Sequence, residues 1–439
     1  MADQVSAAKT RSRWAVGAVL AAVALLAFAR AQCSEAAEDH KAGKMKLADC
    51  KAKYGKKVKL AACHKQEAEA AAHAQVPDHA VKAPDPAKSE AAKPVEHQAE
   101  MPKVEAPKAE MPKAETPKLA AKPQEPLKFI KGGNVSAWNI TDVAKVFADA
   151  ERLGLDTITV PVRIDMAAAT SSEVKVDGPS LEFAKKVIAT KPNFHYIIEP
   201  YPWIDNGNVP ETDLNPADKP AWFASYQTAV ASLGKQFPEA WGLYIASNLI
   251  KLEDQSALWM ALVKHVRSVY AGRIIYRTQW WATAAWAPET VAAYQAKLNN
   301  PLFGVVDVIG IAAYFEVIES AAPTVAQIKA ALRSTTVFNR KQDIYAEVMA
   351  LNQKWQKPIF LGELSCPSVD FGAQTPWDPA ASETPNPDIQ KNYLTAYMET
   401  FVQDPSKFLG FSLFTIGHPT KTPYELAPSA AAYVRAFHP

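Results

Sequence analysis

The chain of 439 residues carries 48 basic and 46 acidic residues, a formal net charge of +2, and four cysteines. The balanced charge excludes nucleic-acid binding through a strongly basic surface, and the cysteine content excludes a disulfide-stapled scaffold. Residues 55–128 contain no Phe, Tyr or Trp, whereas ten of the eleven Trp residues follow residue 128. The first part cannot bury enough apolar surface to offset its chain entropy, so we expect a disordered Pro-, Ala-, Lys- and Glu-rich tail before one large folded domain.

The N-terminus has the pattern of an export signal. Three basic residues within the first 13 precede an apolar run over residues 14–28, and Ala29-Arg30-Ala31 offers a cleavage site. The run is shorter than the roughly 20 apolar residues of a spanning helix. We therefore interpret residues 1–31 as a cleaved signal peptide, with an uncleaved membrane anchor as the alternative. Either interpretation predicts a periplasmic or secreted domain.

Residues 32–73 form a short cysteine-containing segment with an internal repeat. Lys46-Leu47-Ala48-Asp49-Cys50 recurs thirteen residues later as Lys59-Leu60-Ala61-Ala62-Cys63. In an oxidising compartment a pair among Cys33, Cys50 and Cys63 can close a small loop, and a solvated helical repeat with incidental thiols is the alternative. His64 follows Cys63 without a preceding Cys-x-x-Cys, which excludes c-type haem attachment.

Residues 74–126 are predicted to be a Pro-rich linker. A Glu-x-Pro-Lys theme recurs at residues 100–103, 110–113 and 115–118. Frequent Pro favours an extended polyproline II chain, which at ~3.1 Å per residue reaches on the order of 100 Å or more. Such a linker suggests a tether that holds the C-terminal domain away from a membrane or an unknown protein partner.

Residues 127–439 alternate between short β-rich runs and helical patterns. Thr141-Asp142 caps the first helical pattern, and others span residues 222–237, 258–270, 343–355 and 389–402. Nearly continuous apolar runs are typical of buried parallel strands, so eight strand–helix units predict an α/β fold, the (β/α)8 TIM barrel. A doubly wound sheet is the alternative, but no Gly-rich nucleotide turn follows the first strand. The predicted strands are residues 129–135, 157–165, 195–202, 241–248, 273–279, 305–314, 358–365 and 408–417.

In such a barrel the active site lies at the C-terminal ends of the strands. Carboxylates, amides and aromatic rings gather there, and together they suit a carbohydrate: rings cover the apolar faces of a sugar while polar groups bind its hydroxyls. We therefore predict a polysaccharide or oligosaccharide ligand. The histidines are scattered, so no metal site and no cofactor are expected. The residues at these ends are Asp165, Glu199, Asn248, Gln279, Trp280, Trp281, Tyr314, Glu363 and His418.

Four segments carry a resemblance: residues 222–226 (WFASY), 266–272 (VRSVYAG), 306–314 (VDVIGIAAY) and 357–363 (KPIFLGE). In order and spacing they resemble glycoside hydrolase family 113 of clan A, a family known for endo-β-mannanases. The resemblance implies that Glu363, ending the seventh strand, is a nucleophile that forms a glycosyl-enzyme intermediate, with Tyr314 beside it. From the residues alone, a buried salt bridge for Glu363 and a core-capping role for Tyr314 are the alternatives.

The fourth strand departs from the family's pattern. The resemblance places an acid/base glutamate where this chain has Asn248, or Leu249 if the alignment shifts by one residue. An amide cannot protonate a leaving group, and loss of general acid catalysis typically removes about 10²–10⁴-fold in rate. Glu199 is the candidate substitute, because the third strand can present it within the ~6.5–9.5 Å that an inverting pair needs. Simple hydrogen bonding by Glu199 is the alternative.

Several aromatic and polar residues complete the expected site. Of five candidate sugar-platform tryptophans, we expect about half to line the cleft and the rest to fill the core. Asp165 and His418 are further candidate substrate contacts, with a structural role as the alternative for Asp165. We expect Cys366 to be a small buried residue and Arg267 to brace the barrel. The candidate platforms are Trp203, Trp280, Trp281, Trp286 and Trp377.

Two functions are compatible with these residues. The first is an exported glycoside hydrolase acting on a β-linked polysaccharide, mannan-like or an envelope exopolysaccharide, with Glu363 as nucleophile and an atypical or missing general acid. The second is a non-catalytic glycan-binding pseudoglycosidase, tethered by its tail to an envelope or polysaccharide-export assembly. The glutamate of the seventh strand favours the first, and Asn248 favours the second.

Overall fold

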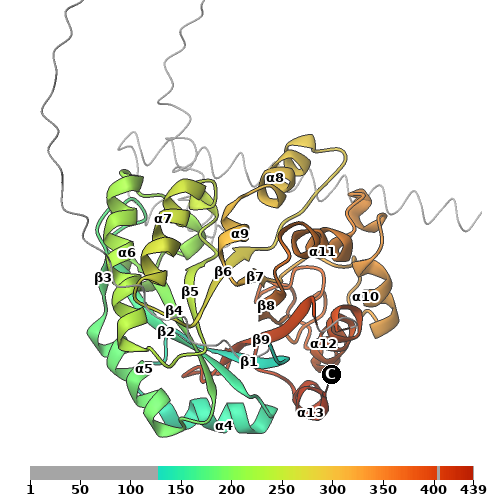
Figure 1. Ribbon diagram of the computed structural model, residues 1–439. Helices are drawn as coiled ribbons and strands as arrows, with labels where there is room; N and C mark the ends of the chain where they lie inside the picture. Colours follow the sequence, from blue (N-terminus) through green and yellow to red (C-terminus); the bar gives the residue numbers. More distant parts are fainter. Residues whose placement is uncertain (1–126, 403–405, 439) are drawn as a thin grey trace, which may run out of the picture. The chain divides into compact units, whose positions relative to one another are not determined.

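The computed structural model describes residues 127–402 and 406–438, which contain the predicted α/β domain (Figure 1). Eight parallel strands close into a barrel, because β1 pairs with both β2 and β9 and the others pair in sequence between them. The predicted TIM barrel is therefore confirmed. Its strands are β1 (Ile130–Val135), β2 (Thr157–Met166), β4 (His195–Ile204), β5 (Gly242–Ser247), β6 (Arg273–Gln279), β7 (Val308–Ala312), β8 (Ile359–Leu364) and β9 (Phe408–Ile416).

One short strand was not predicted. β3 (Lys175–Val176) pairs antiparallel with the end of β2, with Lys175 opposite Asp165 and Val176 opposite Ile164. Two residues leave no periodic pattern in the sequence, so such a strand is visible only once its partner is in place. β2 and β4 also run in register as far as Met166 and Ile204, beyond their predicted ends, which lengthens this side of the barrel.

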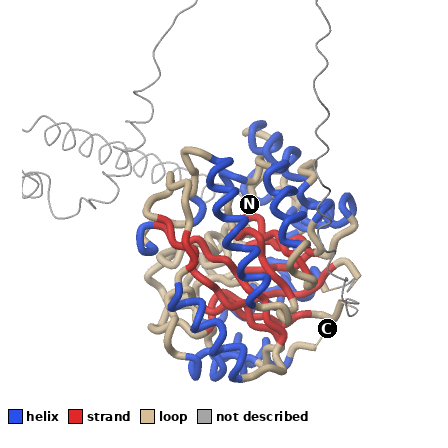
Figure 2. The backbone as a smooth tube through the Cα atoms, turned by 60° about the vertical axis from the view of Figure 1, so that its left-hand side comes forward, coloured by secondary structure: helices blue, strands red, loops and turns tan. Residues whose placement is uncertain are grey.

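Helices surround the barrel (Figures 1 and 2). Several begin at an aspartate whose side chain accepts a backbone N–H three residues later, and the caps at Asp142 and Asp343 lie where the sequence predicts helix starts. The helices are α4 (Val143–Leu153), α5 (Gly178–Thr190), α6 (Lys219–Gln236), α7 (Ser256–Arg267), α8 (Pro288–Leu298), α9 (Leu302–Val305), α10 (Val325–Leu332), α11 (Ile344–Trp355), α12 (Pro387–Phe401) and α13 (Pro428–Ala436), with short 3-10 turns η1 (Asp205–Gly207), η2 (Glu211–Asp213), η3 (Ile250–Leu252) and η4 (Val337–Asn339).

The inside of the barrel is apolar near the N-terminal ends of the strands. We call this set of side chains the apolar layer, and it is separate from the larger core between barrel and helices. Layers of this kind make the lower half of a TIM barrel a packed core rather than a pore. The apolar layer consists of Ile130, Ile197, Tyr244, Ile275, Val308, Phe360 and Leu409.

Just above the apolar layer, small residues leave room for one large polar side chain. Arg277 follows Ile275 by two residues on β6 and so lies on the same face of the strand. A Cβ atom on Gly362 would lie 2.9 Å from Cδ of Arg277 and 2.6 Å from the hydroxyl oxygen of Tyr244. A Cβ atom on Gly310 would lie 3.2 Å from Cα of Arg277. These glycines therefore allow the arginine to lie inside the barrel.

Two further expectations about the barrel are confirmed. Cys366 is 1% exposed, and burial raises the pKa of its thiol above the ordinary value. Arg267 at the end of α7 pairs with Asp307 and donates to the carbonyl oxygen of Gly272 at 3.1 Å, which ties the helix to the start of two strands.

Within residues 127–402 and 406–438, no helix is long and apolar enough to cross a membrane. The predicted signal peptide, cysteine-containing segment and linker all lie outside the described residues.

Candidate active site

A buried cluster of charged side chains crosses the barrel directly above the apolar layer. Nη2 of Arg277 (β6) contacts Oε1 of Glu199 (β4) and, at 2.7 Å, Oε1 of Glu363 (β8). The arginine and the two glutamate side chains are 1%, 4% and 9% exposed. The same nitrogen donates to the hydroxyl of Ser247, and Nη1 donates to the carbonyl oxygen of Gly362 at 3.3 Å. Arg277 therefore joins Glu199 and Glu363. The sequence pointed to both glutamates but not to the arginine.

The shared arginine brings the two carboxylates close together. Because one nitrogen contacts an oxygen of each, the nearer oxygens of Glu199 and Glu363 lie within about 6 Å of one another. This separation permits two carboxyl groups to act on one glycosidic bond. Glu199 is nevertheless 3% exposed and directed at Arg277. Glu199 thus accepts a hydrogen bond from a neighbouring side chain, which was the alternative to its acting as an acid. Its role as substitute acid stays a prediction.

Burial raises the pKa of Glu363 to about 7. Loss of solvent is the largest cause of the raised pKa, and the positive charge of Arg277 opposes it. Repulsion from Glu199 and Glu211 raises the pKa further, while the polar side chain of Asn248 lowers it. Glu363 therefore exchanges its proton near neutral pH. Carboxyl groups perturbed by both burial and specific charged neighbours are candidates for catalysis.

Asn248 is one of the two positions, with Leu249, where the family resemblance suggests an acid. It follows β5 directly with a φ of 55°, a left-handed conformation that asparagine adopts more readily than most residues. Its Nδ2 donates to Oε1 of Glu211 at 3.1 Å, while its Oδ1 is buried and accepts no hydrogen bond from the described residues. The next residue, Leu249, is 1% exposed in the core between barrel and helices. Asn248, not Leu249, therefore faces the carboxylates.

Glu211 is a member of this cluster that sequence analysis missed. It begins η2 in the connection between β4 and α6, after a sharp turn in which Asp205, Asn206 and Gly207 all have positive φ. Glu211 is half-buried and forms no salt bridge with a described residue. An acidic residue in a long loop carries no distinguishing signal in a sequence. Its contact with Asn248 is what identifies it.

Tyrosines line the same space. Burial raises the pKa of Tyr201 and Tyr314 well above the ordinary value, and the negative charge of Glu363 raises both further. Both hydroxyls therefore stay protonated at neutral pH and can donate to a carboxylate or a ligand. Tyr314 follows β7, and its ring packs edge-on against Phe414 at a centroid distance of 6.2 Å. The tyrosine expected beside the nucleophile thus lies within electrostatic range of Glu363.

The candidate platform tryptophans separate into buried and exposed ones. Trp281 is 8% exposed, stacks on Tyr294, and donates from its indole N–H to Glu347 at 2.8 Å. Trp280 is half-buried and packs on the core. Trp286 and Trp377 are 66% and 47% exposed.

The remaining candidate platform has a partner that was not predicted. Trp203 is buried under the guanidinium of Arg163, which lies 3.9 Å from the ring centre. Trp138, in the connection between β1 and α4, packs edge-on against Trp203 at 4.7 Å and is 54% exposed. An exposed ring supported by a buried one is suited to covering a sugar.

The two other candidates, Asp165 and His418, make their observed contacts with residues outside the carboxylate cluster. Asp165 is opposite Trp203 in the strand register, and its charged neighbours are Asp177, Arg163 and Lys175. Burial raises the pKa of Asp165, and Asp177 raises it further. His418 is half-buried, with Nδ1 placed 2.7 Å from the carbonyl oxygen of Thr420, so its observed contact is local.

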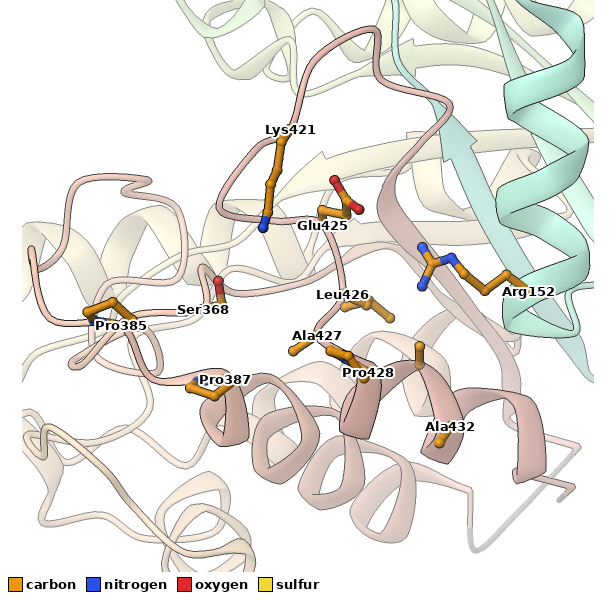
Figure 3. A pocket seen from close by; sticks show the side chains of 11 residues that line it. Arg152, Ser368, Pro385, Pro387, Lys421, Glu425, Leu426, Ala427, Pro428 and Ala432 are labelled. Carbon is orange, nitrogen blue, oxygen red and sulfur yellow. The ribbon is translucent and has the colours of Figure 1, made fainter.

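A separate surface pocket of about 700 Å³ lies beside the segment that follows β9 (Figure 3). Proline and alanine side chains from the starts of α12 and α13 form most of its wall, with Lys421 and Glu425 on the connecting segment and Arg152 reaching in from α4. None of the candidate site residues lines it. Within residues 127–402 and 406–438 no group of His, Cys, Asp and Glu side chains is arranged to hold a metal ion.

An eight-stranded parallel barrel with a buried pair of glutamates inside it is the architecture of a glycoside hydrolase-like protein. The model of Glycoside Hydrolase Family 113 matches residues 206–431, more than half of the chain, and the chain belongs to this family. The predicted resemblance is therefore confirmed. No curated protein matches the chain.

Solved structures of the same family share the fold. A GH113 β-1,4-mannanase superposes with a TM-score of 0.55 at 18% identity, covering 70% of this chain and 98% of that one. The β-mannanase AaManA from Alicyclobacillus acidocaldarius, in complex with ManMIm, has a TM-score of 0.55 at 17% identity, covering 70% of this chain and 96% of that one. At such identities the likeness concerns the barrel and not the details of the site.

Proposed function

We propose that this protein is an exported glycoside hydrolase that cleaves a β-linked polysaccharide with Glu363 as its nucleophile. The observation that carries the proposal is the place of Glu363, at the end of β8 in a barrel of this family, held by Arg277 at 2.7 Å. The solved structures that share the fold are named β-mannanases, so a β-linked mannan is the first substrate to test.

The surroundings of Glu363 suit attack on an anomeric carbon. Arg277 fixes one carboxylate oxygen and leaves the other for reaction, and the protonated hydroxyl of Tyr314 lies within electrostatic range. Because Glu363 exchanges its proton near neutral pH, a large ionised fraction is available as nucleophile above about pH 7. The carboxylate would form a covalent glycosyl-enzyme intermediate that water then hydrolyses.

The acid side of the reaction is atypical, because Asn248 has no proton to give. Substrates with poor leaving groups need general acid help, whereas an activated aryl glycoside leaves without it. The two substrate classes therefore test the nucleophile and the acid separately. Glu199, which the sequence suggests as the substitute, has the drawback that its carboxylate is buried against Arg277.

The deciding experiment incubates the purified protein with β-mannan, β-glucan, xylan and 2,4-dinitrophenyl β-glycosides. We expect release of dinitrophenolate that Glu363→Gln abolishes, because the amide is not a nucleophile. Glu182→Gln is the matched control, since Glu182 is 70% exposed on α5. Turnover that is the same in Glu363→Gln and the parent protein would refute the assignment of the nucleophile.

Asn248 favours a second function, a non-catalytic glycan-binding barrel tethered through the N-terminal segment. Under this alternative the parent protein binds β-linked oligosaccharides, as measured by calorimetry, and releases no product from any glycoside, activated or not. Export is tested on its own by N-terminal sequencing of the protein from its native cells. A chain beginning at Gln32 is the expected result, and a chain still carrying residues 1–31 would favour the membrane anchor.

A further inference from the structure

The inference below rests on the proposed function and concerns the missing acid. In the site the acid position holds an amide, and the side chain that accepts a hydrogen bond from this amide is a carboxylate. Nδ2 of Asn248 donates to Oε1 of Glu211 at 3.1 Å, although the two residues are 37 positions apart and come from different connections of the barrel. The functional group lost from β5 is thus present on the neighbouring loop.

Glu211 faces the same space as Glu363. The negative charge of Glu211 raises the pKa of Glu363, and Asn248, the donor to Glu211, also acts on the Glu363 carboxyl group. The charge of Glu211 also raises the pKa values of Tyr201 and Tyr314, which Glu363 raises as well. Glu211 and Glu363 therefore have the same side chains as neighbours, as two carboxyl groups acting on one glycosidic bond need.

Glu211 differs from Glu199 in two properties that a general acid needs: it is accessible from outside, and its carboxyl group is not held in an ion pair. Glu199 is 3% exposed, and its Oε1 is engaged by Arg277. Glu211 is half-buried, forms no salt bridge with a described residue, and its Oε2 accepts no hydrogen bond from the residues that the structure describes. The carboxyl group of Glu211 is therefore accessible to a ligand, whereas that of Glu199 is held in a buried ion pair.

The segment that carries Glu211 is shaped by its sequence. Gly207 has a φ of 83°, and a Cβ atom there would lie 2.7 Å from the ring of Trp203 and 3.1 Å from that of Trp138. The turn at residues 205–207 thus packs against the tryptophan pair before the chain reaches η2. The chain then reaches η2, where Glu211 accepts the hydrogen bond from Asn248.

We propose that Glu211 is the general acid and base of this enzyme, held in position by Asn248. In the first step the carboxylate of Glu363 forms a bond to the anomeric carbon as the bond to the leaving oxygen breaks, and that oxygen takes the proton of Glu211. In the second step Glu211, now ionised, takes a proton from water as the water oxygen bonds to the anomeric carbon. The ester bond to Glu363 breaks, which restores both carboxyl groups.

The test compares Glu211→Gln and Glu211→Ala with the parent protein on two classes of substrate. For β-1,4-linked mannohexaose or cellohexaose we expect a loss of about 10²–10⁴-fold in kcat/KM. For the 2,4-dinitrophenyl β-glycoside of the same sugar we expect kcat/KM to fall by less than about tenfold, because the leaving group needs no proton. Sodium azide should raise kcat of Glu211→Ala and yield a β-glycosyl azide, since azide attacks the intermediate without a base.

The controls separate this role from a structural one. Asp213→Asn changes an exposed carboxylate of the same η2 turn, paired with Lys251 on the surface, and should behave like the parent protein. Equal losses on both substrate classes in Glu211→Gln would overturn the proposal, as would parent-like hydrolysis of the oligosaccharides. The same substrate-dependent loss in Glu199→Gln, with Glu211→Gln unaffected, would assign the acid to Glu199 instead.

Failure of the proposed function gives a different result. If the parent protein releases nothing from dinitrophenyl glycosides, there is no Glu363-dependent hydrolysis and the acid assignment falls with it. If product release depends on Glu363 but is unchanged by substitution of Glu211 on every substrate, the proposed function stands and only the inference about Glu211 is wrong.

Discussion

The lower and upper halves of the barrel interior differ in chemistry although they are built by the same strands. On β6 the inward residue changes from Ile275 to Arg277, and on β4 it changes from Ile197 to Glu199, within a single strand repeat. The lower residues fill the apolar layer, while the upper ones form the charged cluster. On these two strands the barrel therefore separates stability from function at a sharp boundary, two residues along the strand.

The two halves also differ in their energetics. Apolar side chains inside the barrel contribute stability in proportion to the area that they bury. Buried ions lose their hydration, and their mutual attraction repays this only in part, so a charged cluster is retained for what it does rather than for stability. The difference leads to three predictions that test whether the boundary is real.

The largest effect is expected for Arg277→Met. Removing the cation leaves Glu199 and Glu363 buried without a positive partner, and breaking a buried ion pair typically destabilises a protein by about 3–5 kcal/mol. We expect a loss of this size in the free energy of unfolding at pH 8, measured by urea denaturation. The loss should shrink towards pH 5, because protonation of Glu363, whose pKa is raised to about 7, removes one of the unpaired charges.

A double variant is the control for Arg277→Met. Glu199→Gln in the same chain removes one of the unpaired charges and should recover part of the lost stability. An Arg277→Met protein that is as stable as the parent at pH 8 would show that the charged cluster is not held by this ion pair.

The second effect concerns pH and the nucleophile. The pKa of Glu363 is raised to about 7, so its ionised fraction is about one half at pH 7 and falls steeply below that pH. With an activated aryl glycoside, kcat/KM should therefore fall by about fivefold between pH 7 and pH 6, and by about tenfold more between pH 6 and pH 5. The charged and titratable groups that interact with Glu363 are Arg277, Glu199, Glu211, Tyr201, Tyr244, Tyr314 and Tyr424.

Glu199→Gln sharpens the pH prediction. This substitution removes a negative charge that raises the pKa of Glu363, so the acid limb of the profile should move to lower pH. A parent profile that is flat down to pH 5 would mean that the attraction of Arg277 outweighs burial, and the proton exchange inferred for Glu363 would be wrong.

The fold was predictable because strand patterns are local. Runs such as 305–314 carry continuous hydrophobicity, and the caps at Asp142 and Asp343 are read from single residues and their positions. The site was predictable where the fold alone determines the position of a residue. Glu363 and Asn248 stand at or just after strand ends, and the barrel brings strand ends together.

Arg277 and Glu211 could not be predicted for two different physical reasons. Arg277 lies inside a strand that reads as buried, and only the space left by Gly310 and Gly362 shows that the barrel can hold a guanidinium there. Glu211 lies on a loop whose path depends on the turn at residues 205–207 and on packing against Trp203. The path of a loop and the space left inside a barrel both depend on tertiary packing, so a local sequence pattern cannot predict them.

The smallest effect, and the cleanest test of the boundary, is expected for Ile275→Val. Ile275 is fully buried in the apolar layer, two residues below Arg277 on the same face of β6. Loss of one methylene there should lower the free energy of unfolding by about 0.5–1.5 kcal/mol. If the two halves are independent, the acid limb of the pH profile and the ratio of activated to unactivated substrate turnover should both stay at the parent values. A shift of the acid limb in Ile275→Val would show instead that packing of the apolar layer sets the position of Arg277, and through it the pKa of Glu363.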